Sequence, residues 1–370
     1  MHESMMAPLA SESLDLDPAN PSSLGIITAT RAGTATYTDA SGDIQTASPN
    51  TVRVDHVDGV PMILVEPAAT NLIENSEDFS GILYLKDSGV TIGTTNHVSP
   101  AGSEDATKIE VTDSGRLYTN LTSATYATSL YLKSGTFSHF KIAGNNLDLQ
   151  SQTFAGGTIE FVGDGWYRIS FTSTSSRSFQ VQAYPDANYS VHTDSGDYFI
   201  WGAQVETGTV ATSYIPTSGS TVTRAADNLV IDGSDFTNFY NPSEGTIYAE
   251  AIWKDVSTGG SGQAILFGDN NNMRFLYGYL GRLRAYDGTN ISDSGNSASS
   301  NVLFRGASTY NASNLSVCLD GGTVDTEAHS GNLSNATQFS IGRHSLGGSS
   351  ESLNGHIKRL IYWPHHSDNL

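Results

Sequence analysis

Two Asp or Glu side chains that face each other across a cleft can cleave a glycosidic bond. Glycosidases that carry their acids on one strand use the spacing Glu-x-Asp-x-x-Glu, and the sequence has no such run. The nearest acidic strand, Tyr248-Ala-Glu-Ala-Ile-Trp253, holds a lone carboxylate, Glu250. A nucleophile elbow Gly-x-Ser-x-Gly is also absent. We therefore expect no enzymatic activity. The alternative left open is a glycoside hydrolase or polysaccharide lyase.

Aromatic side chains could instead bind sugars, because a ring stacks on the C–H face of a sugar while amides and carboxylates bond its hydroxyls. An aromatic residue in a strand is more often part of a core. The Tyr277-Gly-Tyr279 segment and the polar run 269–272 are the stronger candidates, because loops between strands carry recognition. The candidate carbohydrate-binding residues are Trp166, Tyr184 and Tyr189 in the first half, and Asp269, Asn271, Tyr277, Tyr279 and Tyr286 in the second.

Charge and composition exclude several classes of partner. The chain has 370 residues, with 18 basic and 38 acidic side chains and a formal charge of −20. Nucleic acid and anionic membrane are poor partners for such a surface, because their phosphates would be repelled. No secretory signal and no membrane-spanning apolar run can be recognised. The single cysteine, Cys318, allows no intrachain disulfide, as is typical of assembly in a reducing cytoplasm.

Short alternating segments separated by Gly, Ser, Thr and Asn clusters predict an all-β fold. We expect two tandem β-sandwich (jelly-roll) domains preceded by an extended N-terminal arm. The predicted domains are residues 1–58, an arm with a hairpin around Ser41-Gly42, then 59–226 and 227–370. Strands are predicted at 128–133, 137–143, 158–162, 166–172, 178–184 and 197–206 in the first sandwich. The second has 245–253, 263–268, 273–277, 282–286, 315–319, 338–342 and 356–363.

Several runs resemble a family of tailed-phage structural proteins. The first is Glu66-Pro67 followed by Thr70-Asn71-Leu72 and Asn75-Ser-Glu-Asp-Phe79; the second is Arg31-Ala-Gly-Thr-Ala-Thr-Tyr37 before it. The most specific match joins Tyr198-Phe-Ile-Trp-Gly-Ala-Gln-Val-Glu206 to Ala211-Thr-Ser-Tyr-Ile-Pro-Thr217 and Thr223-Arg-Ala-Ala-Asp227. The resemblance implies a jelly roll similar to carbohydrate-binding modules over 59–226. More weakly, Phe339-Ser-Ile-Gly-Arg343 and 353–362 resemble the closing strands of concanavalin A-like lectin sandwiches.

The resemblance also implies a place for a metal ion. Similar carbohydrate-binding sandwiches often hold a structural calcium between the first strand and a late strand, with hard oxygen ligands. The matching carboxylates here are Glu74, Glu77, Asp78 and Glu206. Helix capping and turn formation explain the same residues without calcium. No cofactor is otherwise expected.

Together these patterns predict a virion protein. We expect a tail fibre, head fibre, spike or decoration subunit that binds a host cell-surface glycan and contacts other virion proteins through its N-terminal arm. Such appendages are often trimers, so a homo-oligomer is expected, assembled in the host bacterial cytoplasm. A purely architectural virion subunit remains a second alternative.

Overall fold

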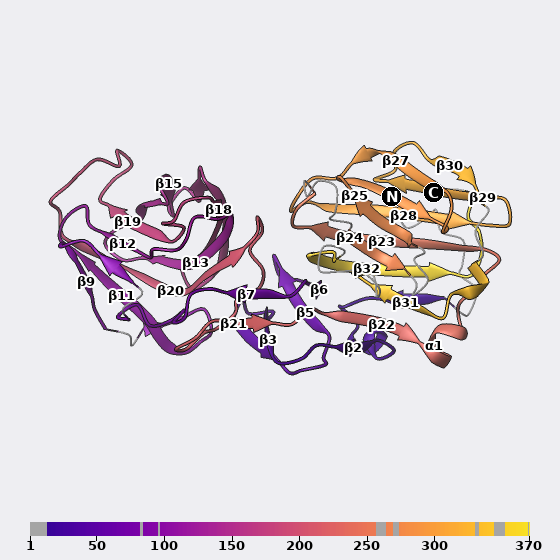
Figure 1. Cartoon of the computed structure of the whole chain (residues 1–370), viewed down its shortest axis with the longest axis horizontal. Helices are drawn as coiled ribbons and strands as arrows, with labels where there is room; N and C mark the ends of the chain where they lie inside the picture. The colour runs from indigo at the N-terminus through magenta and orange to yellow at the C-terminus, as the bar shows by residue number, and fades with distance from the viewer. Residues whose placement is uncertain are drawn as a thin grey trace. The chain divides into compact units, whose positions relative to one another are not determined.

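The computed structural model describes residues 13–81, 84–94, 97–256, 264–268, 274–329, 333–343, 352–368 and 370; for 264–268 and Asn335 it describes the backbone alone. These residues confirm the all-β prediction (Figure 1). In the described part of the chain, one short α-helix, α1 (Gly233–Thr237), accompanies two 3-10 turns, η1 (Pro21–Leu24) and η2 (Leu333–Asn335). None of the described helices is long and apolar enough to span a membrane.

The chain forms two compact units that are not consecutive in sequence. Unit 1 comprises the N-terminal segment up to Thr34, Ala47–Ala68 and Ala225–Leu370. Unit 2 comprises Ala35–Thr46 and Ala69–Arg224. This division differs from the predicted order of arm, first sandwich and second sandwich, because the chain passes four times between the units.

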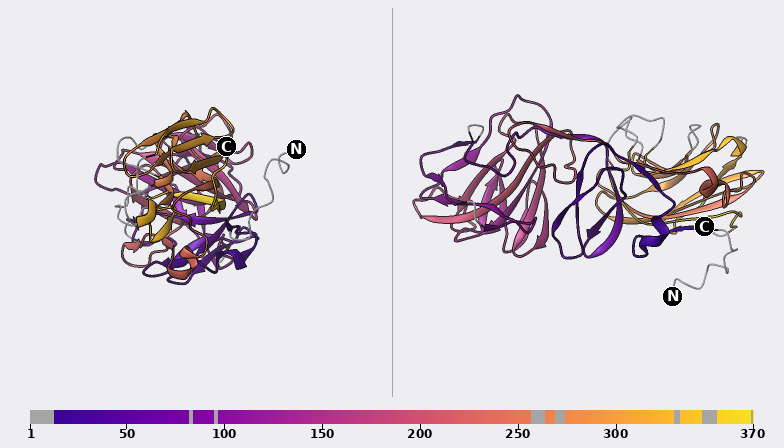
Figure 2. Two further views of the ribbon diagram at one scale, coloured as in Figure 1. Left: turned by 90° about the vertical axis from the view of Figure 1, so that its right-hand side faces the viewer. Right: turned by 90° about the horizontal axis from the view of Figure 1, so that it is seen from below.

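Unit 1 contains two antiparallel sheets. Figure 2 shows the ribbon from two further directions, with the C-terminal strands of this unit in orange and yellow. In the described residues one sheet has eight strands: β30 (Asp325–Ala328), β29 (Asn314–Leu319), β28 (Leu303–Tyr310), β23 (Gly245–Trp253), β32 (Gly355–Trp363), β6 (Val60–Val65) and β5 (Arg53–Val57), with β1 (Leu14–Leu16) also paired to β32. The other has seven: β2 (Thr28–Thr30), β22 (Asn228–Asp232), β31 (Gln338–Ile341), β24 (Ala264–Gly268), β25 (Arg274–Tyr279), β26 (Arg282–Tyr286) and β27 (Ile291–Ser297).

Unit 2 also contains two main sheets. Among its described residues the first has seven strands: β10 (His97–Val98), β11 (Glu104–Val111), β20 (Gly196–Thr207), β13 (Tyr126–Ser134), β18 (Trp166–Ser173), β17 (Gly157–Gly163) and, paired to β11, β9 (Val90–Ile92). The second has six: β16 (Thr153–Phe154), β15 (Asn145–Asp148), β14 (His139–Ile142), β19 (Gln180–Tyr184), β12 (Arg116–Tyr118) and β8 (Leu85–Lys86). Two-stranded pairs are formed by β7 (Ala69–Asn71) with β21 (Val222–Arg224) and by β3 (Ala35–Thr38) with β4 (Ile44–Ala47).

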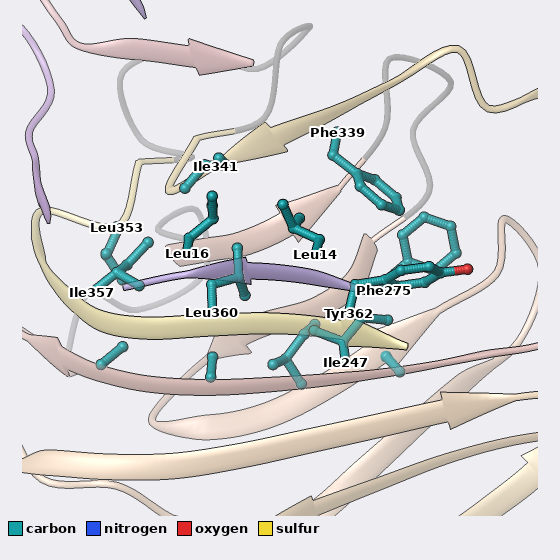
Figure 3. Close-up of a cluster of buried hydrophobic side chains, with 14 of the residues drawn as sticks. Leu14, Leu16, Ile247, Phe275, Phe339, Ile341, Leu353, Ile357, Leu360 and Tyr362 are labelled. Carbon is teal, nitrogen blue, oxygen red and sulfur yellow. The ribbon is translucent and has the colours of Figure 1, made fainter. Parts of the chain in front are cut away.

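The predicted N-terminal arm is built into these sheets. Leu14 and Leu16 of β1 lie opposite Tyr362 and Leu360 of β32, and both leucines are buried. Figure 3 shows them among Phe339, Ile341 and Ile357, side chains contributed by β31 and β32. Burying a leucine stabilises a fold by roughly 1.5–3 kcal/mol, so the burial of these two side chains favours the pairing of β1 with β32. The predicted hairpin is confirmed as β3 and β4, with Gly42 at φ +90° in its turn.

A buried charge cluster joins distant segments of unit 1. The Arg53 guanidinium donates to Glu66 at 2.9 Å and also to Asp227, while Arg31 donates to Asp227 at 3.0 Å. Burial alone would lower the pKa of Arg53, but the two carboxylates hold it above its usual value. Lys254 lies 3.3 Å from Glu66. The Glu66-Pro67 and Thr223–Asp227 motifs therefore supply two carboxylates of an internal ion cluster.

The most specific sequence match has a comparable structural explanation in unit 2. Glu206 accepts hydrogen bonds from the Thr212 amide at 2.9 Å and the Thr212 hydroxyl at 2.6 Å. Gln204 accepts from the Ile215 amide at 2.6 Å, and Asn71 donates to the Ile215 carbonyl at 2.9 Å. These buried groups hold segment 211–217 against β20. The Trp201 and Tyr214 rings then pack with centroids 4.5 Å apart.

Candidate functional site

Three of the sequence-selected tyrosines meet on one face of unit 1. Along β26, Leu283 and Ala285 point into the core, so Arg282, Arg284 and Tyr286 point to the opposite side of the sheet. Their cross-strand partners on β25 are Tyr279, Tyr277 and Arg274, and Asp293 of β27 lies opposite Arg284. We call this surface the arginine–tyrosine face, made of Arg274, Tyr277, Tyr279, Arg282, Arg284, Tyr286 and Asp293.

The rings and guanidinium groups of this face alternate. The Arg284 guanidinium lies 4.3 Å from the Tyr279 ring centroid. The Arg274 guanidinium lies 5.7 Å from the Tyr277 centroid and 5.9 Å from the Tyr286 centroid. Cation–π contacts of this kind contribute roughly 0.5–2 kcal/mol each and fix the orientation of both groups. The face is therefore a preorganised array of rings and cations.

Asp293 orients the arginines. Its carboxylate accepts from Arg284 Nε at 2.8 Å and from Nη2 at 2.7 Å, and Arg282 lies 3.6 Å away. Partial burial opposes ionisation of Asp293, but the Gly295 amide and the two arginines hold its pKa below the usual range. The Arg284 side chain, held by both contacts with Asp293, is only 21% exposed, whereas that of Arg282 is 49% exposed. Arg282 is thus the more accessible of these two cations.

The tyrosines of this face differ in exposure. Tyr279 and Tyr286 are half-buried, so part of each side chain remains accessible. Tyr277 is only 2% exposed, and burial raises the pKa of its hydroxyl although Arg284 and Arg274 oppose the shift. Tyr277 is therefore corrected from a sugar platform to a ring that positions the two arginines.

Tyr184 and Tyr189 belong to a different surface, on the six-stranded sheet of unit 2. Phe140, Val181 and Ala183 point into the core, so their neighbours point outward. We call this the mixed polar face, made of Arg116, Tyr118, His139, Lys141, Asn146, Asp148, Gln180, Gln182 and Tyr184. Tyr184 is 3% exposed, because Tyr189 packs 5.7 Å from its ring and Lys141 extends over it at 5.1 Å. Tyr184 is therefore a buried support, and Tyr189 is the half-buried ring beside it.

Three basic side chains of the mixed polar face have nearby acceptors. Arg116 Nε donates to Asp87 at 2.7 Å, Lys141 donates to the Tyr189 carbonyl at 3.0 Å, and His139 lies 3.6 Å from Asp148. These residues are not among the candidates predicted from the sequence. The alternation of Arg116-Leu-Tyr118 and His139-Phe-Lys-Ile142 would have placed them on one face, as Arg282-Leu-Arg-Ala-Tyr286 would have done in unit 1.

Trp166 is corrected from a surface platform to a core residue. It is 2% exposed, and its indole Nε1 donates to the Val98 carbonyl at 3.1 Å. It belongs to a second apolar cluster of unit 2, in which Ile44 of β4 and Tyr214 cover the outer side of the seven-stranded sheet. On the other face of β18, Ile169 and Phe171 are buried and Tyr167 is half-buried.

The four proposed calcium ligands have separate structural roles. Glu206 is buried and accepts from Thr212, Glu77 accepts from the Tyr214 hydroxyl at 2.8 Å, and Asp78 accepts from Ser80 at 2.6 Å. Glu74 is exposed. The described residues contain no group of three or more His, Cys, Asp or Glu side chains that could hold a metal ion. Calcium binding therefore stays a prediction with no assembled carboxylate set in this part of the chain.

Two other sequence-selected groups can be placed as follows. Asp269 and Asn271 lie outside the described residues. Glu250 accepts from Lys358 Nζ at 2.6 Å and from the Tyr248 hydroxyl at 2.8 Å. Burial would raise the pKa of Glu250, but these two donors and Arg305 hold it below its usual value. A general acid needs the opposite shift, so this environment does not favour that role for Glu250.

No protein-family model matches the sequence, and no curated protein matches it. Solved structures share partial likeness. A sialidase of Trypanosoma rangeli has 13% identity and a TM-score of 0.30, with 38% of this chain and 24% of that chain covered. A Bacteroides ovatus protein proposed to bind carbohydrate has 10% identity and a TM-score of 0.30, covering 71% and 77%. Domains LG4-5 of the mouse laminin α1 chain have 12% identity and a TM-score of 0.25, covering 85% and 91%. TM-scores this low do not extend the function of those proteins to this chain.

Proposed function

We propose that this chain is a non-enzymatic virion subunit of a tailed phage or phage-like particle that binds host cell-surface glycan. The observation that carries glycan binding is the arginine–tyrosine face, where Tyr279 and Tyr286 are half-buried beside three arginines and Asp293. Half-buried rings offer a surface for sugar C–H groups, and oriented guanidinium and carboxylate groups offer hydrogen bonds to hydroxyls.

The virion part of the proposal rests on the sequence motifs that resemble tailed-phage structural proteins. We propose a fibre, spike or decoration subunit, present as a homo-oligomer with a trimer favoured and located on the particle. Contacts with other virion proteins would involve a folded surface, because β1 and β5 are strands of unit 1. Electron microscopy of particles labelled with an antibody to this chain tests the location, and labelling confined to the host cytoplasm contradicts it.

Glycan binding is tested with the full chain on an array of bacterial surface polysaccharides, comparing Tyr279→Ala with Tyr118→Ala. Tyr118 is a half-buried tyrosine on the mixed polar face whose ring also lies near arginine, with the Arg177 guanidinium 4.7 Å from its centroid. Loss of the Tyr279 ring should weaken binding about tenfold, the equivalent of roughly 1.4 kcal/mol. Tyr118→Ala should leave it unchanged. Absence of binding to every glycan contradicts the proposal and favours the architectural alternative.

The enzymatic alternative has its own measurement. Release of reducing ends or unsaturated sugars from host capsule by the full chain would support a hydrolase or lyase. Turnover that disappears in Glu250→Gln would replace the non-enzymatic proposal.

A further inference from the structure

Two arginines of the arginine–tyrosine face share one carboxylate, although the chain as a whole is acidic. Acidic residues outnumber basic ones by 38 to 18 in the sequence. At the outward positions of β26, Arg282 and Arg284 both contact the carboxylate of Asp293 on β27. A cationic surface on an acidic protein attracts anions to that place while the remaining surface repels them.

The two faces differ in how their cations are matched. On the mixed polar face, Arg116 has Asp87, the His139 ring lies near Asp148, Lys141 has a backbone carbonyl, and Arg177 stacks on Tyr118. On the arginine–tyrosine face, Arg282 and Arg284 share the one carboxylate of Asp293. Arg284 makes the short contacts at 2.7 and 2.8 Å, and the more exposed Arg282 lies 3.6 Å from the same carboxylate.

Arg282 also lies beside the accessible ring. Its cross-strand partner is Tyr279, so a guanidinium and a half-buried tyrosine are neighbours on one surface. A planar guanidinium binds carboxylate and sulfate groups through two parallel hydrogen bonds, which neutral hydroxyls do not match.

We propose that the glycan bound by the arginine–tyrosine face is anionic, with a carboxylate or sulfate group on Arg282 and the adjoining sugar ring against Tyr279. This inference rests on the proposed glycan binding and names its ligand class. Arg284 is a positioning residue: it stacks on Tyr279 and is held by Asp293.

The test uses three polymers with one backbone: dextran, carboxymethyl-dextran and dextran sulfate. The full chain should bind at least one charged derivative about tenfold more tightly than dextran, and added salt should weaken that binding. Carboxymethyl-dextran and dextran sulfate distinguish a carboxylated sugar from a sulfated one. Arg282→Gln should weaken binding of the charged polymer about two- to fivefold. The matched control is Arg305→Gln on the other sheet of unit 1, where Arg305 is 54% exposed and lies 3.6 Å from Glu250.

Each outcome decides the proposal. Preference for a charged polymer that falls in Arg282→Gln and persists in Arg305→Gln supports it. Equal binding to all three polymers, binding to none of them, or equal losses in the two arginine variants overturns it. The proposed glycan binding survives that result if a neutral glycan on the array still needs Tyr279. It fails separately if no glycan binds at all.

Discussion

The arginine–tyrosine face of unit 1 and the mixed polar face of unit 2 are built on the same plan, with polar and aromatic side chains standing outward from a sheet whose other side is core. They differ in how completely the charges are matched. In unit 2, Arg116 has Asp87 and His139 has Asp148. In unit 1, Arg282 and Arg284 share Asp293. Both surfaces carry arginines beside accessible rings, so the feature particular to unit 1 is that two arginines contact a single carboxylate.

The largest expected effect separates the two units. Asp227→Ala removes the carboxylate that Arg31 and Arg53 share, leaving two buried cations undercompensated in unit 1. Breaking such a pair costs about 3–5 kcal/mol. Fluorotryptophan NMR during denaturant titration can resolve the units, because Trp253 and Trp363 belong to unit 1 while Trp166 and Trp201 belong to unit 2. Only the unit 1 signals should show a lower denaturant midpoint of unfolding. The exposed Asp235→Ala is the control, and equal shifts in both units would contradict independent stability.

A smaller effect compares one cation from each face. Arg284→Met leaves the partly buried Asp293 without its closest partner and should destabilise unit 1 by about 1–3 kcal/mol. Lys141→Met removes a cation bonded to a backbone carbonyl and should cost unit 2 less than about 1 kcal/mol. Urea unfolding of the two variants measures the contrast. A larger loss from Lys141→Met would reverse the ranking of the faces.

The pH dependence of folding stability compares one carboxylate from each face. The folded pKa is below the usual value for both Asp293 and Asp148, against the effect of burial. Their stabilisation is therefore complete above the unfolded pKa of about 3.9 and is lost as the pH falls through the lower folded value. Asp293→Asn and Asp148→Asn should each reduce the loss of folding stability at acid pH, by about 1 kcal/mol or less. Salt should weaken the Asp293 contribution more, because arginines contribute to it, whereas Ser151 and the Gln150 amide are the main groups that stabilise the Asp148 carboxylate. Equal salt sensitivity would contradict this assignment.

The smallest effect tests whether hydroxyl or ring matters at Tyr286. Tyr286→Phe removes the bond from its hydroxyl to the Gly288 carbonyl at 2.8 Å and keeps the ring beside Arg274. We expect a loss of about 0.5–1 kcal/mol in unit 1 stability and less than a twofold change in glycan binding. Calorimetry and the array measure the two quantities. A large loss of binding would show that the hydroxyl itself contacts the ligand.

Sequence periodicity predicts the strands well where alternation is strong. The predicted strands at 166–172, 197–206, 245–253 and 315–319 correspond to β18, β20, β23 and β29. Alternation also predicts that Ile169 and Phe171 share a buried face. These features depend on local backbone geometry, which neighbouring residues determine.

Contacts between distant segments could not be predicted in this way. Trp166 is buried because β4 and Tyr214 cover the outer side of its sheet. The alternation of residues along one strand does not show that a distant segment covers its second face. Glu206 is an internal hydrogen-bond acceptor because segment 211–217 folds back onto β20. The strands β1 and β6 both pair with β32 across most of the chain length, a pairing that composition alone does not indicate.

The interleaved course of the chain sets an order of events during synthesis. Strand β1 leaves the ribosome long before its partner β32, which ends at Trp363. All of unit 2 is synthesised in the interval. Its sheets can form while the leucines of β1 still lack their packing partners. Long-range pairing of this kind is slow to form and leaves apolar strand surface exposed meanwhile. The unit that is begun first is therefore finished last, and the vulnerable period of the nascent chain falls on the early strands of unit 1.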